Sequence, residues 1–290
     1  MSDDPFVTHR NLLFTVAYEI LGSAVDAEDV LQESWLRWAD VDKEQVREPR
    51  AYLVRVVTRQ ALNHLRSVSR RREEYVGEWL PEPLLTSPDV ADDVELAESV
   101  SIAMLTVLET LGPTERAVFV LREVFDVPYD EIAEAVGKTP AAVRQIAHRA
   151  KDHVAARRPR IQVARHEQER VIERFLAALN TGDVQGLMDV MAPDVVLVAD
   201  GGGVVTAAVR PIVGTEKLGA FFAAGLAALG EGLVGSPMWL NGAPGARVEV
   251  DGALVGVISL TVENGRVTRI HSIVNPQKLA RLDAEAALTR

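Results

Sequence analysis

Three short helical segments, the last of them basic, run through residues 111–158 and constrain the fold of this chain more than any other stretch. Gly112 and Pro113 precede the first segment, whose apolar residues recur at helical spacing, and residues 126–128 break the chain after it. Gly137 ends the second segment. Thr139 then supplies an N-cap, with Pro140 at the first helical position. A third helix therefore starts at a new angle, which predicts a helix-turn-helix.

The third helix has an apolar side, which includes Val143, Ile146, Ala147 and Ala150, and a basic side. A recognition helix that enters the DNA major groove presents polar and basic side chains of this kind. An ordinary helical hairpin with a solvated basic face is the alternative, but the coincidence of cap, glycine and basic exposure favours DNA binding. The candidate DNA contacts are Arg144, Gln145, His148, Arg149 and Lys151.

A formal net charge of -11 argues against nucleic acid only if the charges are evenly spread, and they are not. Residues 47–72 hold eight arginines and one acid, and residues 141–166 hold seven basic residues and one acid. Residues 73–100, between them, hold nine acids and no base. Two DNA-contacting surfaces joined by an acidic connector would produce this distribution.

The absence of cysteine excludes disulfides and thiolate metal sites. An acidic N-terminus without an apolar signal core, and the absence of a bilayer-length apolar stretch, place the protein in the cytoplasm without a membrane partner. No pattern calls for a metal or a cofactor.

The arginine-rich stretch at residues 47–72 follows an amphipathic segment at residues 26–38. In that segment Trp35 and Trp38 are either core residues or part of a partner surface. Pro49 then opens a long helix with a row of arginines on one face. Arginines neutralise phosphates, and Asn or His side chains contact unpaired bases. A solvated basic face is the alternative. The candidate contacts are Arg55, Arg59, Asn63, His64, Arg66 and Arg70.

Several of these segments together resemble the extracytoplasmic-function group of bacterial sigma factors. They are DAEDVLQESWLRW from residue 26, PRAYLVRVVTRQALNHLR from residue 49, LGPTERAVFVLREV from residue 111 and YDEIAEAVG from residue 129. The resemblance implies that the helix from residue 50 meets the melted -10 element and that the basic third helix reads the -35 element. It also implies docking on core RNA polymerase through Asp29, Gln32, Glu33, Trp35 and Leu36.

The acidic connector contains prolines at positions 81, 83 and 88, which discourage regular structure. A solvated spacer is one interpretation. The segment WLPEPLL, residues 79–85, is too apolar to leave in water, so we expect it to pack on a neighbouring domain.

The C-terminal third predicts an α+β cone with one concave face, built from helices at 167–179 and 214–229 and strands at 195–199, 204–210, 247–250, 254–262 and 267–273. It resembles the SnoaL-like branch of the NTF2-like fold through FLAALNTGDVQGLMDVMAPDVVLV and VENGRVTRIHSIVNPQKL, in which Asn-Gly at 264–265 predicts a hairpin turn. Some relatives of this branch are cyclases or isomerases that use Asp and His. Asp200 and His271 therefore invite an enzymatic interpretation, although a turn aspartate and a structural histidine are favoured.

A sigma-factor subgroup with a fused SnoaL-like domain fits better still, through a WLPEP linker, a DGGG turn and an NPQKL tail. Val204 and Gln277 replace the lysine and aspartate usual in that subgroup. The resemblance implies that the fused domain replaces a separate anti-sigma protein. We hypothesise that it clasps the linker and the sigma-2 domain, limiting access to polymerase, through Trp79, Leu80, Pro81, Asp200, Gly201, Gly202, Gly203, Asn275, Pro276, Lys278 and Leu279.

The sequence thus predicts a multi-domain protein. An all-α sigma-2 domain at 1–75 and an all-α sigma-4 helix-turn-helix domain at 101–160 are joined by an acidic linker at 76–100, and an α+β SnoaL-like regulatory domain follows at 161–290. The predicted function is promoter recognition with core RNA polymerase, without catalysis. The alternatives are a ligand-controlled helix-turn-helix regulator, with a small molecule in the C-terminal pocket, and a lyase or isomerase with a DNA-binding appendage.

Overall fold

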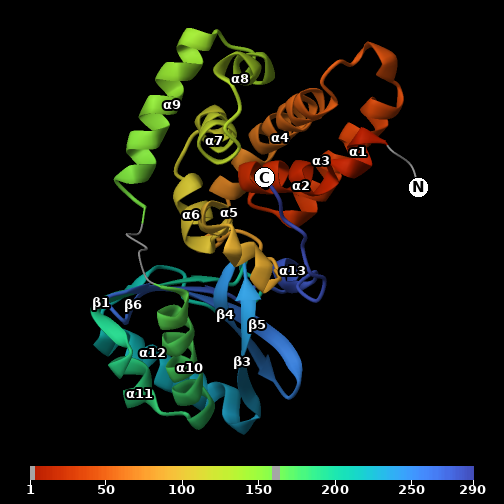
Figure 1. The fold of residues 1–290 in the computed structure, drawn as a ribbon. Coiled ribbons are helices and arrows are strands. Elements are labelled where there is room, and N and C mark those ends of the chain that lie inside the picture. Colours follow the sequence, from red (N-terminus) through yellow and green to blue (C-terminus); the bar gives the residue numbers. More distant parts are fainter. Residues whose placement is uncertain (1–3, 159–163) are drawn as a thin grey trace.

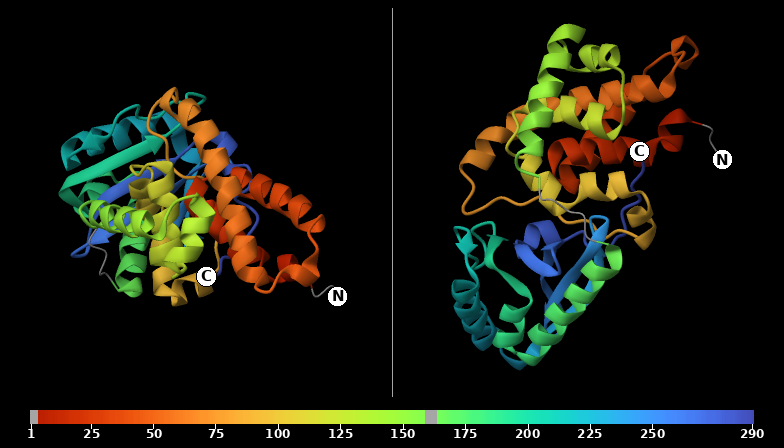
Figure 2. Two further views of the ribbon diagram at one scale, coloured as in Figure 1. Left: turned by 90° about the horizontal axis from the view of Figure 1, so that it is seen from above. Right: turned by 60° about the vertical axis from the view of Figure 1, so that its left-hand side comes forward.

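The computed structural model describes residues 4–158 and 164–290, without the side chains of residues 69–73 and 231. A helical part formed by the first half of the chain stacks on an α+β domain formed by the second half (Figure 1). The right-hand view in Figure 2 shows the same stacking. The boundary expected at residues 160 and 161 lies outside the described residues.

The N-terminal bundle forms because apolar residues recur at helical spacing between clear helix-stop signals. Gly22 takes a left-handed conformation with φ of 67° and ends α2, and the Ser23 hydroxyl accepts a hydrogen bond from the Asp26 N–H to cap α3. Tyr18 and Trp38 are buried in the core. The elements are α1 (Pro5–Thr8), α2 (Arg10–Leu21), α3 (Ala24–Ala39), η1 (Lys43–Gln45) and α4 (Pro49–Glu73).

The linker has no helix or strand from residue 79 to residue 87, apart from an isolated bridge at Leu85, and it is mostly buried there, as the apolar composition of residues 79–85 predicts. Leu80 is 0% exposed and Leu84 is 7% exposed. The irregular part is shorter than the expected 76–100, because the Asp93 carboxylate accepts from the Leu96 N–H and starts a helix. The elements are η2 (Pro88–Asp92), α5 (Val94–Val100) and α6 (Ile102–Leu108).

The helix-turn-helix is confirmed in its elements and its punctuation. Gly137 has φ of 68°, and the Thr139 hydroxyl accepts from the Ala142 N–H at 3.3 Å. The expected inward residues Val143, Ile146 and Ala150 are buried. The elements are α7 (Pro113–Phe119), a π-helical stretch η3 (Val120–Val124), α8 (Tyr129–Val136) and α9 (Pro140–Ala155).

The C-terminal domain contains a six-stranded sheet of order β2-β1-β6-β5-β4-β3, in which only β1 and β6 are parallel neighbours. Helices α10 and α12 pack on one face, over an apolar cluster that includes Phe175 and Ile270. The elements are α10 (Arg165–Thr181), α11 (Val184–Asp189), β1 (Met191–Asp200), β2 (Ile212–Val213), α12 (Thr215–Leu229), η4 (Gly230–Gly232), β3 (Leu233–Leu240), β4 (Ala243–Val250), β5 (Ala253–Glu263), β6 (Arg266–Ile273) and α13 (Pro276–Leu279).

Two details of the expected strands are wrong. Residues 204–210 form a loop, since Gly202 and Gly203 take positive φ values and turn the chain out of the sheet, leaving Val204 and Val209 exposed. Strand β3 was not expected, because Gly235 and Pro237 interrupt its pattern. An edge strand tolerates both residues. The hairpin turn at Asn264 and Gly265 is confirmed.

The helical part has one core. A continuous apolar cluster extends from Phe6 in the N-terminal bundle to Val154 in the helix-turn-helix, because α4 packs directly on α7 and α8. A separate interdomain cluster joins the linker to the sheet face opposite α10 and includes Leu80, Ile102, Val257 and Leu279. The C-terminal end of the chain returns to the helical part (Figure 1), where Leu288 enters the first cluster.

Candidate nucleic-acid interface and interdomain clasp

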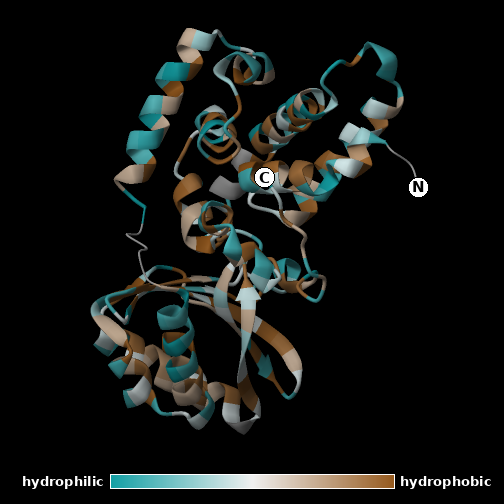
Figure 3. Ribbon diagram, in the orientation of Figure 1, coloured by the Kyte–Doolittle hydropathy of each residue, from teal (hydrophilic) through white to brown (hydrophobic). Residues whose placement is uncertain are grey.

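The basic face of α9 is open to solvent. Arg144, Gln145, His148, Arg149 and Lys151 are all exposed, and hydrophilic residues recur along this helix in Figure 3. Two of them contact residues outside α9. The Arg144 guanidinium lies 5.5 Å from the centre of the Tyr129 ring, and the Lys151 ammonium donates to Glu123 at 2.7 Å. The hydrogen bond to Glu123 raises the pKa of Lys151 and keeps it cationic.

The arginine row on α4 is partly covered by the helix-turn-helix. Arg55 forms an ion pair with Glu134 of α8, and Arg59 Nη2 donates to the Glu134 carbonyl at 2.7 Å. Asn63 and Arg66 remain exposed. His64 is half-buried, with its Nε2 3.0 Å from an Asp26 carboxylate oxygen in α3. The Arg70 side chain lies outside the described residues.

The outer face of α3 is uncovered. Asp29, Gln32, Glu33, Trp35 and Leu36 are all exposed, with Leu36 at 66%. Gln32, Trp35 and Leu36 line a shallow groove together with Phe6 and Leu31. The two tryptophans therefore separate: Trp38 is core, at 1% exposed, and Trp35 belongs to a surface.

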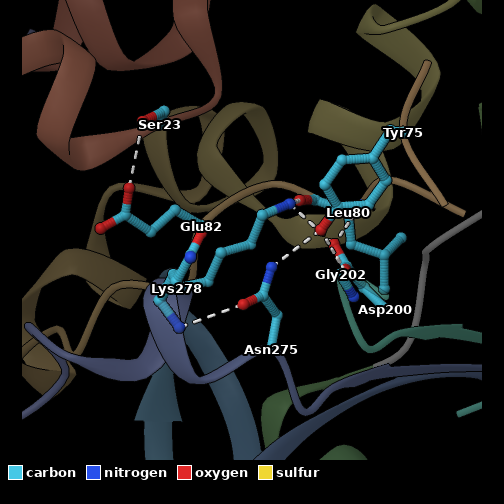
Figure 4. A network of polar contacts seen from close by, with 9 residues as sticks. Ser23, Tyr75, Leu80, Glu82, Asp200, Gly202, Asn275 and Lys278 are labelled. Atoms are coloured by element: carbon cyan, nitrogen blue, oxygen red, sulfur yellow. Dashed lines mark hydrogen bonds and ion pairs between the residues drawn. The ribbon is translucent and has the colours of Figure 1, made fainter. Parts of the chain in front are cut away.

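Asp200 anchors the contact between the two halves of the molecule, and its side chain is fully buried. One carboxylate oxygen accepts from the Tyr75 hydroxyl at 2.6 Å. The other accepts from the Leu80 N–H at 2.9 Å and the Lys278 ammonium at 2.7 Å. Lys278 also donates to the Leu80 carbonyl and lies 4.0 Å from the centre of the Trp79 ring. Figure 4 shows Tyr75, Leu80 and Lys278 converging on Asp200 at the end of β1.

Asn275 completes this clasp and explains the glycine turn. Its Nδ2 donates to the Tyr75 hydroxyl at 2.8 Å, and its Oδ1 accepts from the Gln277 N–H where Pro276 starts α13. A Cβ at Gly202 would lie 2.3 Å from Asn275 Nδ2, and a Cβ at Gly203 would lie 3.0 Å from the Val76 Cβ. A Cβ at Gly201 would lie 2.6 Å from the Val205 carbonyl. The three glycines therefore permit close approach, while buried Pro81 and Leu279 lie near the same junction.

Two residues of the interface are not among the contacts expected from the sequence, although Glu82 lies within the WLPEP motif. Asn241, in the β3–β4 turn, is fully buried. Its Oδ1 accepts from the Leu84 N–H at 2.8 Å, and its Nδ2 donates to the Tyr18 hydroxyl and the Val100 carbonyl. Glu82 is 4% exposed and binds the start of α3. The Asn-Gly pair at 241–242 signals a turn, but its distant partners cannot be inferred from it.

The arrangement favours structural roles for Asp200 and His271. Both Asp200 oxygens accept bonds from groups of this chain. His271 is fully buried, and burial lowers its pKa to about 3, which keeps the imidazole neutral. None of the helices in the described ranges is both long and apolar enough to span a bilayer.

Comparison with known proteins agrees with this architecture. Residues 6–71 match the model of Sigma-70 region 2, and residues 101–154 match that of Sigma-70 region 4. The ECF RNA polymerase sigma factor SigJ of Mycobacterium tuberculosis is 38% identical over 96% of this chain and 93% of its own length. Its crystal structure covers 96% of this chain and 98% of its own, with a TM-score of 0.77.

Two further proteins are similar to this chain. The probable ECF sigma factor SigI of the same organism is 34% identical over 96% of this chain and 94% of its own. A SnoaL-like protein of unknown function from Burkholderia thailandensis aligns with 38% of this chain and 95% of its own, at 15% identity and a TM-score of 0.32. The chain has the helix-turn-helix and the two basic helices, and it is 38% and 34% identical to two such factors over nearly its full length. It therefore belongs to the extracytoplasmic-function (ECF) family of RNA polymerase sigma factors.

Proposed function

We propose that this sigma factor directs core RNA polymerase to its promoters through three surfaces and that its C-terminal domain modulates this activity in cis. The observation that carries the cis modulation is the buried Asp200 clasp, since it joins Tyr75, at the end of the sigma-2 domain, and Leu80 of the linker to Asn275 and Lys278 of the C-terminal domain. The domain limits 1–75, 76–100, 101–160 and 161–290 are part of this proposal.

Core polymerase docks on α3 in this proposal. Trp35 and Leu36 are large apolar side chains left in water, and an exposed aromatic beside an aliphatic groove is typical of a protein-binding hot spot. Asp29, Gln32 and Glu33 supply the polar rim.

Promoter DNA is contacted in two places. The exposed side of α9 enters the major groove at the -35 element, with Arg144, Gln145 and Arg149 facing base edges and phosphates. The α4 row binds the melted -10 strand through Arg55, Arg59, Asn63 and Arg66, and also through Arg70. Arg55 and Arg59 bind Glu134 in the closed molecule, so the helix-turn-helix must move away before they reach DNA.

Cis restraint therefore acts mainly on the DNA-binding side. The α3 surface is already uncovered, whereas the clasp holds the linker and the adjoining α5 and α6 against the sheet and limits how far α9 can separate from α4. In this proposal the C-terminal domain restricts the binding of promoter DNA, rather than the access to polymerase that the sequence suggested.

This role needs no catalytic group of the chain itself, because polymerase performs phosphoryl transfer, and it places the protein in the cytoplasm beside its polymerase. The ligand-controlled regulator is not favoured, since it requires neither the α3 surface nor a second basic helix. A small molecule in the cone stays a weaker proposal, because the helix-facing side of the sheet is packed with side chains such as Phe175 and Leu218.

The test measures binding of full-length protein and of a fragment ending at residue 158 to core polymerase and, as holoenzyme, to promoter DNA at constant salt. We expect both proteins to bind polymerase and the fragment's holoenzyme to bind promoter DNA more tightly. Failure of both to bind polymerase contradicts the three-surface proposal. Equal promoter affinity contradicts restraint by the C-terminal domain.

A further inference from the structure

Glu82 of the linker binds the beginning of α3, the helix proposed to dock polymerase. Its Oε2 accepts from the Ala24 N–H at 2.7 Å, from the Val25 N–H at 3.2 Å and from the Ser23 hydroxyl at 3.1 Å. The Ser23 contact is drawn in Figure 4. The Glu82 main chain is held at the same corner: its N–H donates to the Gly22 carbonyl, and its carbonyl accepts from the Tyr18 hydroxyl at 2.7 Å.

These contacts complete a cap that α3 lacks on its own. The first N–H groups of a helix have no partner within the helix, and a carboxylate there also interacts favourably with the helix dipole. Ser23 satisfies the Asp26 N–H and leaves the N–H groups of Ala24 and Val25 to Glu82. Burial raises the pKa of Glu82, so the carboxylate is costly to hold there without these donors.

The C-terminal domain grips the linker on both sides of Glu82. Two residues before it, the Leu80 N–H donates to Asp200 and the Leu80 carbonyl accepts from Lys278. Two residues after it, the Leu84 N–H donates to Asn241, and the Leu84 carbonyl accepts from the Asn241 N–H. Leu80 and Leu84 therefore bind the C-terminal domain through their main chains, while the Glu82 side chain between them binds the start of α3.

We propose that Glu82 is a positioning residue for polymerase docking: it caps α3 from the linker, and the C-terminal domain holds it in place through Asp200 and Asn241. The inference rests on the proposed docking role of α3. It gives the C-terminal domain a supporting function beside its restraint of the DNA-binding side.

The first experiment compares Glu82→Ala with Glu82→Gln, which retains an oxygen acceptor, in the full-length protein. We expect Glu82→Ala to speed amide hydrogen exchange at Ala24 and Val25 and to weaken core polymerase binding by about fivefold, as loss of one helix cap would. Glu82→Gln should restore most of both signals. Glu74→Ala, which removes an exposed acid just before the linker, is the matched control and should behave as wild type.

The second experiment tests whether the C-terminal domain acts through Glu82. Asn241→Ala removes the grip on Leu84 and should also weaken polymerase binding, but it should have little further effect in the Glu82→Ala background. Affinity for -35 duplex DNA serves as the readout that a global folding defect would lower and that this proposal leaves unchanged.

Wild-type or tighter polymerase binding by Glu82→Ala, or fully additive losses in the double variant, overturns the proposal. A wild-type protein that fails to bind polymerase contradicts the proposed function instead. In that case hydrogen exchange at Ala24 and Val25 still decides whether Glu82 caps α3.

Discussion

At the scale of single residues, Gly202 is the most constrained position of the clasp. It has φ of 63°, and a Cβ there would lie 2.3 Å from Asn275 Nδ2. We expect Gly202→Ala to break the Asn275–Tyr75 hydrogen bond, open the clasp and change promoter-dependent transcription. Gly252→Ala is the control, because its φ of 77° brings the same backbone strain, roughly 1 kcal/mol, with nothing within 4 Å of the added Cβ. Transcription by Gly202→Ala that equals the control contradicts a role for the close approach.

Lys278 compensates the buried charge of Asp200, whose side chain is fully shielded from solvent. Lys278→Met leaves that carboxylate without its cation, so we expect a loss of about 3 kcal/mol in the free energy of unfolding, measured by urea denaturation. The double variant Asp200→Asn with Lys278→Met should recover part of the loss, because it removes both charges. A double variant less stable than Lys278→Met would show that the ion pair is not what holds these residues together.

The same residues mark the limit of what the sequence predicts. The DGGG turn at 200–203 and the tail at 275–279 could be identified as interdomain candidates by resemblance, yet Asp200 taken alone suggested an ordinary turn. Its partners Tyr75, Leu80 and Lys278 are up to 125 positions away in the chain. Local pattern carries no information on such pairings, which is also why Asn241 and Glu82 were missed.

At the scale of elements, the contact between α4 and α8 sets how much of the arginine row is available. The Glu134 carboxylate pairs with Arg55, much as a phosphate would, and the Glu134 main-chain carbonyl accepts from Arg59. We expect Glu134→Ala to raise the affinity of the free protein for single-stranded -10 DNA by roughly two- to threefold, since exposed ion pairs contribute at most about 1 kcal/mol. Asp130→Ala, an exposed acid on the same helix, changes the net charge equally. An equal gain from both variants would indicate a general charge effect.

Glu19 of α2 makes the packing of α2, α5 and α7 sensitive to pH. The Ser99 hydroxyl donates to its carboxyl group, and Arg116 Nε donates to its carbonyl. Burial raises the pKa of Glu19 from 4.5 to about 8. Between these values the folded state keeps a proton that the unfolded chain has lost, so this group makes the protein less stable as pH rises from about 4.5 to 8. Glu19→Gln should flatten that decline in urea denaturation between pH 5 and 8, whereas an unchanged slope would assign it to other groups.

Helices that begin or end at a clear capping, proline or glycine signal were predictable from the sequence. Pro49 opens α4, Thr139 and Pro140 open α9, and Gly22 and Gly137 close their helices, because each residue type has its own backbone or hydrogen-bond reason to be there. The short apolar run at residues 204–210 predicts a strand. The positive φ values of Gly202 and Gly203 override that preference by turning the chain away from the sheet.

At the scale of the whole molecule, the C-terminal domain contacts the helical part at two separate places. It binds the linker at residues 80–86, and its last residues return to the N-terminal bundle. Opening the protein for promoter binding therefore requires the loss of contacts in two places. A molecule held at two points releases more cooperatively than one held by the Asp200 clasp alone.

The C-terminal segment at residues 286–290, which returns to the helical part, provides the most direct test of this second place of contact. The Ala286 N–H donates to the Leu85 carbonyl at 2.8 Å, Leu288 is 6% exposed within the helical core, and the Arg290 side chain pairs with Asp93 of α5's cap. Leu288→Asp would place a charge among apolar side chains, so the segment should detach. We expect faster proteolysis within residues 79–87 and tighter promoter binding by the holoenzyme.

Ala287→Asp is the matched control, because it adds the same charge at an exposed neighbouring position and should leave both measurements unchanged. If Leu288→Asp exposes the linker to protease without changing promoter affinity, the returning segment stabilises the fold but does not restrain the DNA-binding helices. If neither measurement changes, the Asp200 clasp alone holds the two halves, and the two-point account fails. A change in both, absent from the control, means that the covered arginines of α4 become available only when the linker and this segment release together.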